Sequence, residues 1–209
     1  MLKFGLVLLL AASISGQSID TKDGKIKITT VTTAGCGDTV HFITQRLNPV
    51  FNEYKDYLEL EFIPWGRTRR NADGSLTCQF GTRDCWANRV HRCTLNLLKG
   101  DQAAQMSYMN CEFSDPRPAY LLGSYTCAGS AGVSLVDLDR CVSTSEGDDL
   151  EYEAQDAAAA PMQAINFVPA IVFNDEINYD NHFHARGFLR SMICFALERD
   201  PAIGIKCVL

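Results

Sequence analysis

The chain has 209 residues, of which 46% are hydrophobic and 21% charged, so it can bury a sizeable core and is not expected to be disordered. This length lies in the upper part of the usual range for one domain, and one domain is the predicted count. The formal net charge is -6, which leaves no basic excess to neutralise phosphates. Nucleic acid and anionic lipid surfaces are therefore not expected as partners.

The N-terminus has the features of a secretory signal peptide. Lys3 precedes an apolar run at 4–12, and small residues lead to Gly16, after which we place the cleavage, with Ser15 as the alternative. The run of about nine apolar residues is too short to span a bilayer, and no later run approaches the roughly 20 that a membrane helix requires. We predict a signal peptide at 1–16 and no membrane-spanning helix.

The chain contains nine cysteines, which after a signal peptide indicate an oxidised framework rather than cytosolic thiols. Nine is odd, so at least one thiol is left free or pairs between molecules, and the sequence cannot assign the bridges. No Asn-x-Ser/Thr sequon occurs, so no N-glycan is expected. Because a sugar-borne lysosomal address needs such a glycan, we predict secretion outside the cell, with the lysosome as the alternative.

The first part of the chain predicts a strand, a helix and a second strand. Residues 25–33 alternate β-branched and polar side chains, which is typical of a strand, and this strand ends shortly before Cys36. Apolar residues at 40–54 recur at helical spacing, and Pro49 is expected to kink that helix. Residues 58–63 alternate again and predict the second strand.

The rest of the chain predicts a helical insertion followed by one more strand and helix. The cysteine-rich middle, about 67–161, has scattered helical patterning, and we interpret its acidic stretch at 146–153 as a solvated helix face or loop without chemistry. Residues 171–173 predict a strand that begins after Pro169, because proline is not accommodated centrally in a sheet. Residues 185–197 predict a helix packed on that sheet. This order predicts an α/β three-layer fold.

Cys36 is the first candidate reactive residue. It lies where the first strand gives way to the first helix, near the positive end of the helix dipole and its unpaired backbone N–H groups. Thiolates rather than thiols attack disulfides, so this is the position that a redox or nucleophilic cysteine requires. A structural half-cystine or an inert buried thiol is the alternative.

A more specific pattern lies at residues 78–93, which read Cys-Gln-Phe-Gly-x-x-Asp-Cys-x-x-Asn-x-x-x-x-Cys. This segment resembles the signature of the gamma-interferon-inducible lysosomal thiol reductase (GILT) family, Cys-Gln-His-Gly, two residues, Glu-Cys, two residues, Asn, four residues, Cys. Asp84 replaces the Glu, and Phe80 replaces the His and discards a titratable ring. A zinc site at these cysteines is disfavoured, because paired Cys-x-x-Cys spacing is absent. The matching positions are Cys78, Gln79, Gly81, Cys85, Asn88 and Cys93.

The resemblance extends over most of the chain, through Pro64-Trp65-Gly66 and Val168-Pro169. It implies a thioredoxin-like fold, in which the proline before the third strand is cis and faces the reactive cysteine, and it gives Pro169 that role. The implied organisation is a single domain at 17–209 with a mostly helical, disulfide-rich insertion. The scaffold segments are about 25–66 and 162–209, and the insertion is about 67–161.

The reactive motif departs from the family pattern, because the family carries Cys-x-x-Cys where this chain reads Cys36-Gly37-Asp38-Thr39. In the dithiol mechanism the second thiol resolves the mixed disulfide, and Thr39 cannot form a disulfide. Cys36 is left to work at most with an external thiol such as glutathione, which is scarce outside the cell. The Asp38 carboxylate, if close, is expected to raise the pKa of the Cys36 thiol and weaken it further.

The odd cysteine count agrees with the loss of a resolving cysteine. Cys36 becomes the leftover thiol, and the other eight are predicted to close four structural disulfides, each contributing roughly 2 to 4 kcal/mol. The candidate half-cystines are Cys78, Cys85, Cys93, Cys111, Cys127, Cys141, Cys194 and Cys207.

We therefore predict a secreted protein of this family that has lost dithiol reduction and binds another extracellular protein. One alternative is reduction of protein disulfides by a monothiol mechanism through Cys36, and another is a covalent dimer joined by Cys36. No cofactor or metal is expected: His182 and His184 lie on one side of a predicted extended segment, but no third ligand is in sight. Arginines beside an exposed aromatic are common in protein-binding surfaces, so the partner-binding candidates are Trp65, Arg67, Arg69 and Arg70.

Overall fold

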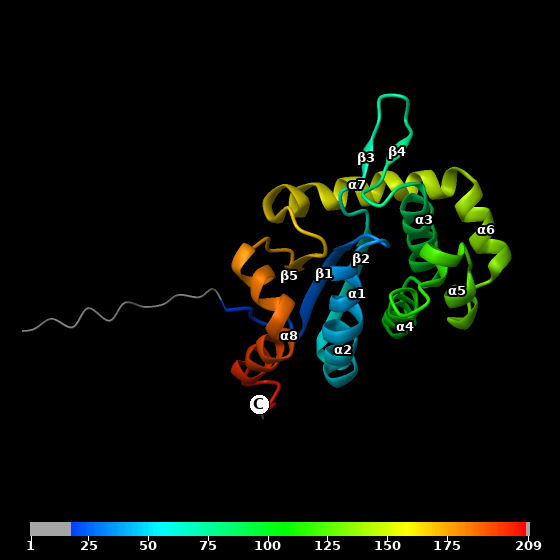
Figure 1. Cartoon of the computed structure of the whole chain (residues 1–209). Helices are drawn as coiled ribbons and strands as arrows, with labels where there is room; N and C mark the ends of the chain where they lie inside the picture. Colours follow the sequence, from blue (N-terminus) through cyan, green and yellow to red (C-terminus); the bar gives the residue numbers. More distant parts are fainter. Residues whose placement is uncertain (1–17, 208–209) are drawn as a thin grey trace, which may run out of the picture.

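The computed structural model describes residues 18–207, so the predicted signal peptide lies outside the described residues. A three-stranded sheet forms the centre of the molecule, in the order β2-β1-β5 (Figure 1). β1 (Ile26–Thr32) pairs in parallel with β2 (Leu58–Pro64) and antiparallel with β5 (Ala170–Phe173). Ile28 of β1 lies opposite Leu60 and Phe173, which places three buried side chains in one row of the core.

The connection from β1 to β2 is helical. It consists of α1 (Gly37–Phe42), the π-helical turn η1 (Ile43–Leu47), α2 (Asn48–Tyr54) and the short 3-10 turn η2 (Lys55–Tyr57). The irregularity expected near Pro49 is the π-helical turn that precedes it, at a point where proline removes a backbone donor. The buried residues of this path pack into the main core, so the β1-helix-β2 order read from periodicity is confirmed.

Most of the remaining helices lie between β2 and β5 in the sequence and form a second body beside the sheet (Figure 1). They are α3 (Thr82–Leu97), α4 (Gln102–Glu112), η3 (Pro118–Leu122), α5 (Thr126–Ser130), α6 (Leu135–Ser143) and α7 (Ser145–Ile165). A hairpin of β3 (Arg69–Arg70) and β4 (Leu76–Thr77) projects from the molecule before α3. Within residues 18–207, every helix is too short or too polar to cross a bilayer.

Four disulfides join the eight cysteines other than Cys36, which is free and buried. Two of them staple the helical region internally, by joining α3 to α6 and α4 to α5, and one ties α8 (Tyr179–Arg199) to the C-terminal segment. Because every sulfur at the three signature cysteines is in a disulfide, the zinc interpretation is excluded. The pairs are Cys78–Cys85, Cys93–Cys141, Cys111–Cys127 and Cys194–Cys207.

The predicted extended segment around His182 and His184 is wrong, because both residues lie in α8. Asn178 caps this helix by accepting a hydrogen bond from the backbone of Asn181, so the helix begins before the apolar pattern that was used to predict it. Positions two apart in a helix are rotated by about 200°. Accordingly His182 is buried and His184 exposed, and among the described residues no cluster of three metal ligands occurs.

The acidic stretch at 146–153 lies in α7, and most of it is solvated as expected, but Glu151 is an exception. Its carboxylate is buried and accepts hydrogen bonds from Arg89 at 2.9 Å and Arg92 at 3.1 Å, both on α3. Burial lowers the pKa of Arg92 to about 10, against the opposing attraction of Glu151. The pairing fixes α7 against α3, which is the helix that carries the signature motif.

Candidate functional site

Cys36 lies directly before the first turn of α1, where its backbone is extended and its carbonyl accepts the N–H of Val40 at 3.1 Å. The thiol is 6% exposed, and Sγ lies 3.5 Å from the carbonyl oxygen of Val168. The peptide bond between Val168 and Pro169 is cis. The structure thus places the thiol at a helix N-terminus and against the segment that leads into β5.

Thr39 lies on α1 and its side chain is fully buried. Its Oγ1 has no hydrogen-bond partner within residues 18–207, although a buried hydroxyl normally has one. A cysteine at this position would lose no hydrogen bond, because its side chain behaves as a small apolar group. The structure therefore gives the threonine hydroxyl no compensating contact in place of the resolving thiol.

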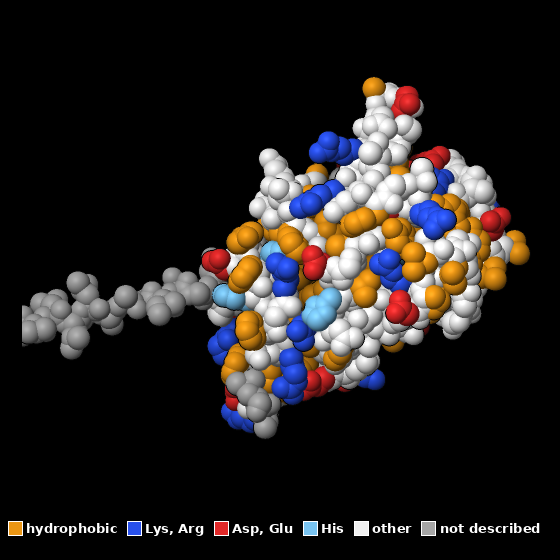
Figure 2. All heavy atoms as spheres, viewed as in Figure 1, with side chains coloured by type: hydrophobic (Ala, Val, Ile, Leu, Met, Phe, Trp, Pro, Cys, Tyr) orange, Lys and Arg blue, Asp and Glu red, His pale blue; other side chains and the backbone are white. Residues whose placement is uncertain are grey.

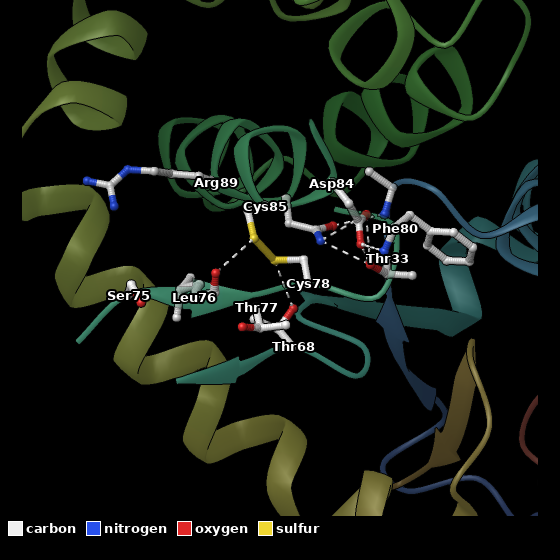
Figure 3. The surroundings of a disulfide bond; sticks show 12 residues. Thr33, Thr68, Ser75, Leu76, Thr77, Cys78, Phe80, Asp84, Cys85 and Arg89 are labelled. Atoms are coloured by element: carbon white, nitrogen blue, oxygen red, sulfur yellow. Dashed lines mark hydrogen bonds between the residues drawn. A yellow bond between two sulfur atoms is a disulfide. The ribbon is translucent and has the colours of Figure 1, made fainter. Parts of the chain in front are cut away.

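Asp84, on the first turn of α3, holds the loop that delivers Cys36 (Figure 3). Its carboxylate is fully buried and accepts hydrogen bonds from the backbone N–H of Gly35 at 2.9 Å, the hydroxyl of Thr33 at 2.9 Å and the backbone N–H of Phe80 at 3.2 Å. The shorter side chain that replaces the family's glutamate therefore still acts as an acceptor for the loop. Because Gly35 directly precedes Cys36, Asp84 positions Cys36 through the backbone.

Asn88, one turn further along α3, completes the same network. Its Oδ1 accepts the backbone N–H of Ala34 at 2.9 Å, and its Nδ2 donates to the hydroxyl of Thr33 at 3.0 Å and to Asp84 at 3.2 Å. The acid and the amide of the signature therefore satisfy two successive backbone donors before Cys36. This is a positioning function that the spacing of the signature did not reveal on its own.

The Cys78–Cys85 disulfide closes the segment between the hairpin and α3 (Figure 3). The hydroxyl of Thr68, in the loop before the hairpin, lies 3.5 Å from the sulfur of Cys78. Within the closed segment Gly81 has a φ of +82°, a conformation that glycine adopts without steric cost, and its carbonyl accepts the backbone N–H groups of Asp84 and Cys85 in the first turn of α3. The disulfide and the glycine together set the start of the helix that carries Asp84.

Phe80, which stands where the family has histidine, packs on the reactive loop. A Cβ atom added to Gly35 would lie 2.5 Å from the Cβ of Phe80, so the ring sits where any larger residue at that position would be. Phe80 is 39% exposed and lines the same pocket as Cys36. The site therefore presents an apolar ring beside the thiol in place of a titratable one.

The pocket at Cys36 is open and has a volume of about 370 Å³. Phe167 also lines this pocket, and its ring lies 3.8 Å from the guanidinium carbon of Arg186 and 5.7 Å from the ring of His182. Burial and the charge of Arg186 lower the pKa of His182 to about 4, so its ring is neutral at neutral pH, and its Nδ1 accepts the backbone N–H of Ile171. The lining residues are Cys36, Gly37, Asp38, Arg67, Gln79, Phe80, Phe167 and Val168.

The structure separates the residues that were expected to form an exposed aromatic and basic surface. Trp65 is only 4% exposed, so that part of the expectation is wrong, and the guanidinium of Arg92 lies 5.7 Å from its ring. Arg70 is engaged by the side chain of Gln155 and lies over an aromatic ring of α7. Arg67 and Arg69 remain exposed. No sequence signal distinguished the buried tryptophan from an exposed one.

The three-stranded sheet, the cis proline and the cysteine at the start of a helix define a thioredoxin-like protein, and solved structures agree. A putative protein disulfide isomerase from Nitrosomonas europaea superposes with a TM-score of 0.55 at 12% identity, over 84% of this chain and 99% of that one. A thioredoxin-like oxidoreductase from Silicibacter pomeroyi superposes with a TM-score of 0.50 at 12% identity, over 80% and 88%. The thioredoxin-like fold with a helical, disulfide-rich insertion is confirmed.

The family is given by the sequence comparisons. Residues 27–130 match the model of the gamma interferon inducible lysosomal thiol reductase (GILT) family. The chain is 25% identical over 174 residues to GILT-like protein 1 of Drosophila melanogaster, covering 76% of this chain and 70% of the relative. It is 24% identical over 188 residues to a gamma-interferon-inducible lysosomal thiol reductase-like protein of Anopheles gambiae, covering 83% and 76%. The chain belongs to the GILT family.

Proposed function

We propose that this chain is a secreted GILT-like protein that has lost dithiol–disulfide reduction and acts by binding an extracellular protein partner. The observation that carries the proposal is the pair formed by Cys36 and Thr39. Cys36 is the one cysteine outside a disulfide, and the residue one helical turn later carries a buried hydroxyl. No second thiol within residues 18–207 is free to complete a dithiol cycle.

The missing thiol matters because of the order of bond changes in the reaction. The first thiolate attacks a substrate disulfide and forms a mixed disulfide, and the neighbouring thiol then displaces the substrate while an intramolecular disulfide forms. A neighbour in the same motif acts at a high effective concentration, which an external thiol lacks. With a hydroxyl in that position, a mixed disulfide at Cys36 persists until another molecule resolves it.

Secretion is supported by the predicted signal peptide, the four disulfides and the absence of any N-glycosylation sequon. Disulfides persist in oxidising compartments, where free glutathione is scarce. The same conditions reduce the usefulness of a thiol that depends on an external reductant. Binding of an extracellular protein is therefore the activity that the scaffold retains without its second cysteine.

A monothiol reductase is the second candidate function, and the free state and position of Cys36 favour it. In that reaction the Cys36 thiolate attacks a protein disulfide, forms a Cys36–substrate disulfide and expels the other substrate sulfur, which takes a proton. A glutathione thiolate then attacks the sulfur of Cys36 and releases the substrate thiol. A second glutathione restores Cys36 and leaves as glutathione disulfide, so the reductant supplies both electrons.

Reduction of insulin disulfides by dithiothreitol, at acidic and at neutral pH, separates the two functions. We expect the parent protein to be no faster than Cys36→Ser, while Thr39→Cys gains turnover because it restores the resolving thiol on an intact scaffold. Turnover by the parent that disappears in Cys36→Ser would instead establish the monothiol enzyme. Non-reducing electrophoresis of the same samples tests the third alternative, a dimer linked by Cys36.

A further inference from the structure

A second hollow adjoins the pocket at Cys36, between the base of the β3–β4 hairpin and α7, and has a volume of about 300 Å³. Arg67 lines both hollows, and its Nη2 donates a hydrogen bond of 2.6 Å to the carbonyl oxygen of Asn166. Asn166 lines the second hollow, and the next residue, Phe167, lines the first. We call the combined surface the Arg67 groove; it leads from Cys36 across Arg67 to the helix α7.

The two ends of the Arg67 groove differ in charge. Arg67, where the two hollows meet, and Arg69, at the hairpin end, are exposed, and no carboxylate of the described residues lies within 4 Å of either guanidinium. By contrast Arg89 and Arg92, on α3, both contact Glu151. Figure 2 shows Lys and Arg side chains below the projecting hairpin, with hydrophobic side chains beside them.

The end at Cys36 has a different character, because the exposed Asp38 lines it together with Phe80 and Phe167. The middle and the wall formed by α7 are lined by small or apolar residues, among them Ala158 and Met162. Small side chains let the backbone of a ligand approach closely. Two guanidinium groups without a carboxylate partner, one where the hollows meet and one at the hairpin end, and a carboxylate in the Cys36 hollow therefore give the groove a polarity.

We propose that the Arg67 groove binds an extended acidic segment of a partner protein, with its carboxylates at Arg67 and Arg69 and an uncharged residue beside Asp38 and Cys36. This inference rests on the proposed function and identifies the surface and the chemistry of the partner. Two guanidinium groups suit carboxylates, which they bind in a bidentate manner. A polyanion such as nucleic acid or a sulfated glycan fits poorly, because its charges continue along its whole length and would also meet the carboxylate of Asp38.

The test uses the full-length mature protein carrying Cys36→Ser, so that thiol exchange cannot produce binding. The probe is a fluorescein-labelled peptide of about ten residues made of Ala, Ser and Asp, since an extended chain covers about 3.3 Å per residue. The comparison peptide has Asn in place of each Asp. Fluorescence anisotropy at about 50 mM salt, where screening is moderate, gives both dissociation constants. We expect the acidic peptide to bind about tenfold or more tightly than its neutral equivalent.

Charge reversal with a matched control locates the site. Arg67→Glu combined with Arg69→Glu should abolish the preference for the acidic peptide. Lys25→Glu combined with Lys55→Glu changes the net charge by the same amount at two exposed lysines outside the groove, and it should change the affinity less than about twofold. Circular dichroism of both double variants checks that each is folded.

Backbone amide chemical shifts recorded during the titration give the position of the peptide directly. Changes confined to 65–69, 155–167 and the Cys36 loop support the proposal. It is overturned by equal loss in the two double variants, by shifts mapped elsewhere, or by tighter binding of a heparin fragment or phosphatidylserine vesicles than of the peptide. The binding test uses Cys36→Ser, which has no free thiol, so its outcome does not depend on whether the parent protein reduces insulin. Failure of the groove proposal and failure of the proposed function can therefore be told apart.

Discussion

Two neighbouring parts of the candidate site differ in how their polar groups are hydrogen-bonded. The loop before Cys36 is held by a buried network in which Asp84 and Asn88 satisfy successive backbone donors. One turn into α1, the Thr39 hydroxyl is equally buried and makes no hydrogen bond within the described chain. The positioning of the first thiol is thus independent of the residue that would complete the dithiol reaction, and a chain can change the second while the first stays in place.

The largest effect on stability is expected from Asp84→Ala, which removes the main acceptor of the hydrogen-bonded loop before Cys36. The substitution leaves the buried hydroxyl of Thr33 and the half-buried N–H groups of Gly35 and Phe80 without their acceptor, and we expect a loss of about 3 to 5 kcal/mol in the free energy of unfolding. Urea denaturation measures it. Asp84→Asn keeps one acceptor oxygen and should lose about half as much.

A second readout separates positioning from general destabilisation. Under native conditions Asp84→Ala should speed the alkylation of Cys36 by iodoacetamide, because the loop that buries the thiol is released. The exposed Asp38→Ala, two residues from the thiol, should change the unfolding free energy by less than about 0.5 kcal/mol. An unchanged alkylation rate in a destabilised Asp84→Ala protein would contradict the positioning role.

The next effect is the pH dependence of the unfolding free energy that is due to His182, whose ring lies next to Phe167. The pKa of His182 is about 4 in the folded protein, below its ordinary value of 6.5, because of burial and the charge of Arg186. Between these two values the unfolded chain binds a proton that the folded chain does not, so stability falls as the pH falls through this window. The loss amounts to at most about 3 kcal/mol by pH 4.

Urea denaturation at a series of pH values checks this slope with a matched pair of histidines. His182→Gln, whose amide oxygen can still accept the N–H of Ile171, should flatten the dependence between pH 6.5 and 4. His184→Gln changes an exposed histidine two positions away and should leave the slope as it is. Equal slopes in all three proteins would show that another group is responsible.

Local patterns predicted the elements that bury one regular face. The alternation at Ile26 and Ile28 and the helical spacing at Ile43 and Leu47 led to β1 and to the helix after it, because burial of these side chains depends only on local periodicity. The position of the site loop was predicted as well, since Cys36 lies shortly after the end of that strand.

The features that sequence reasoning missed depend on contacts between distant segments. Glu151 was read as part of a solvated acidic run, and its burial follows from arginines on α3 that are about 60 positions away. Trp65 is buried with the guanidinium of Arg92 5.7 Å from its ring, and His182 lies in a helix that starts at a cap outside the apolar pattern. A polar side chain is buried where the fold brings its partner next to it, and a single sequence does not reveal which distant residues come into contact.

A smaller effect tests the apolar ring that replaces the family's histidine. Gly35→Ala would place a Cβ 2.5 Å from the Cβ of Phe80, and we expect a loss of about 2 kcal/mol in the free energy of unfolding. In a Phe80→Gly background, which removes the Cβ as well as the ring, the overlap disappears, so the same substitution at Gly35 should cost about 0.5 kcal/mol. Additive losses in this double-mutant cycle would mean that the loop, rather than the ring, excludes a side chain at position 35.

The smallest effect on stability is expected at Thr39, whose hydroxyl makes no hydrogen bond within the described residues. Thr39→Val removes a buried hydroxyl that has no partner, so the unfolding free energy should stay equal or rise by about 1 kcal/mol. Thr39→Cys should be similarly neutral when reduced, and on oxidation it should form a disulfide with Cys36, which a loss of two titratable thiols would report. A loss of more than about 2 kcal/mol in Thr39→Val would reveal a hydrogen bond that the hydroxyl makes in solution. Neutral stability together with gained insulin reduction in Thr39→Cys would mean that a single side chain separates this scaffold from a working dithiol site.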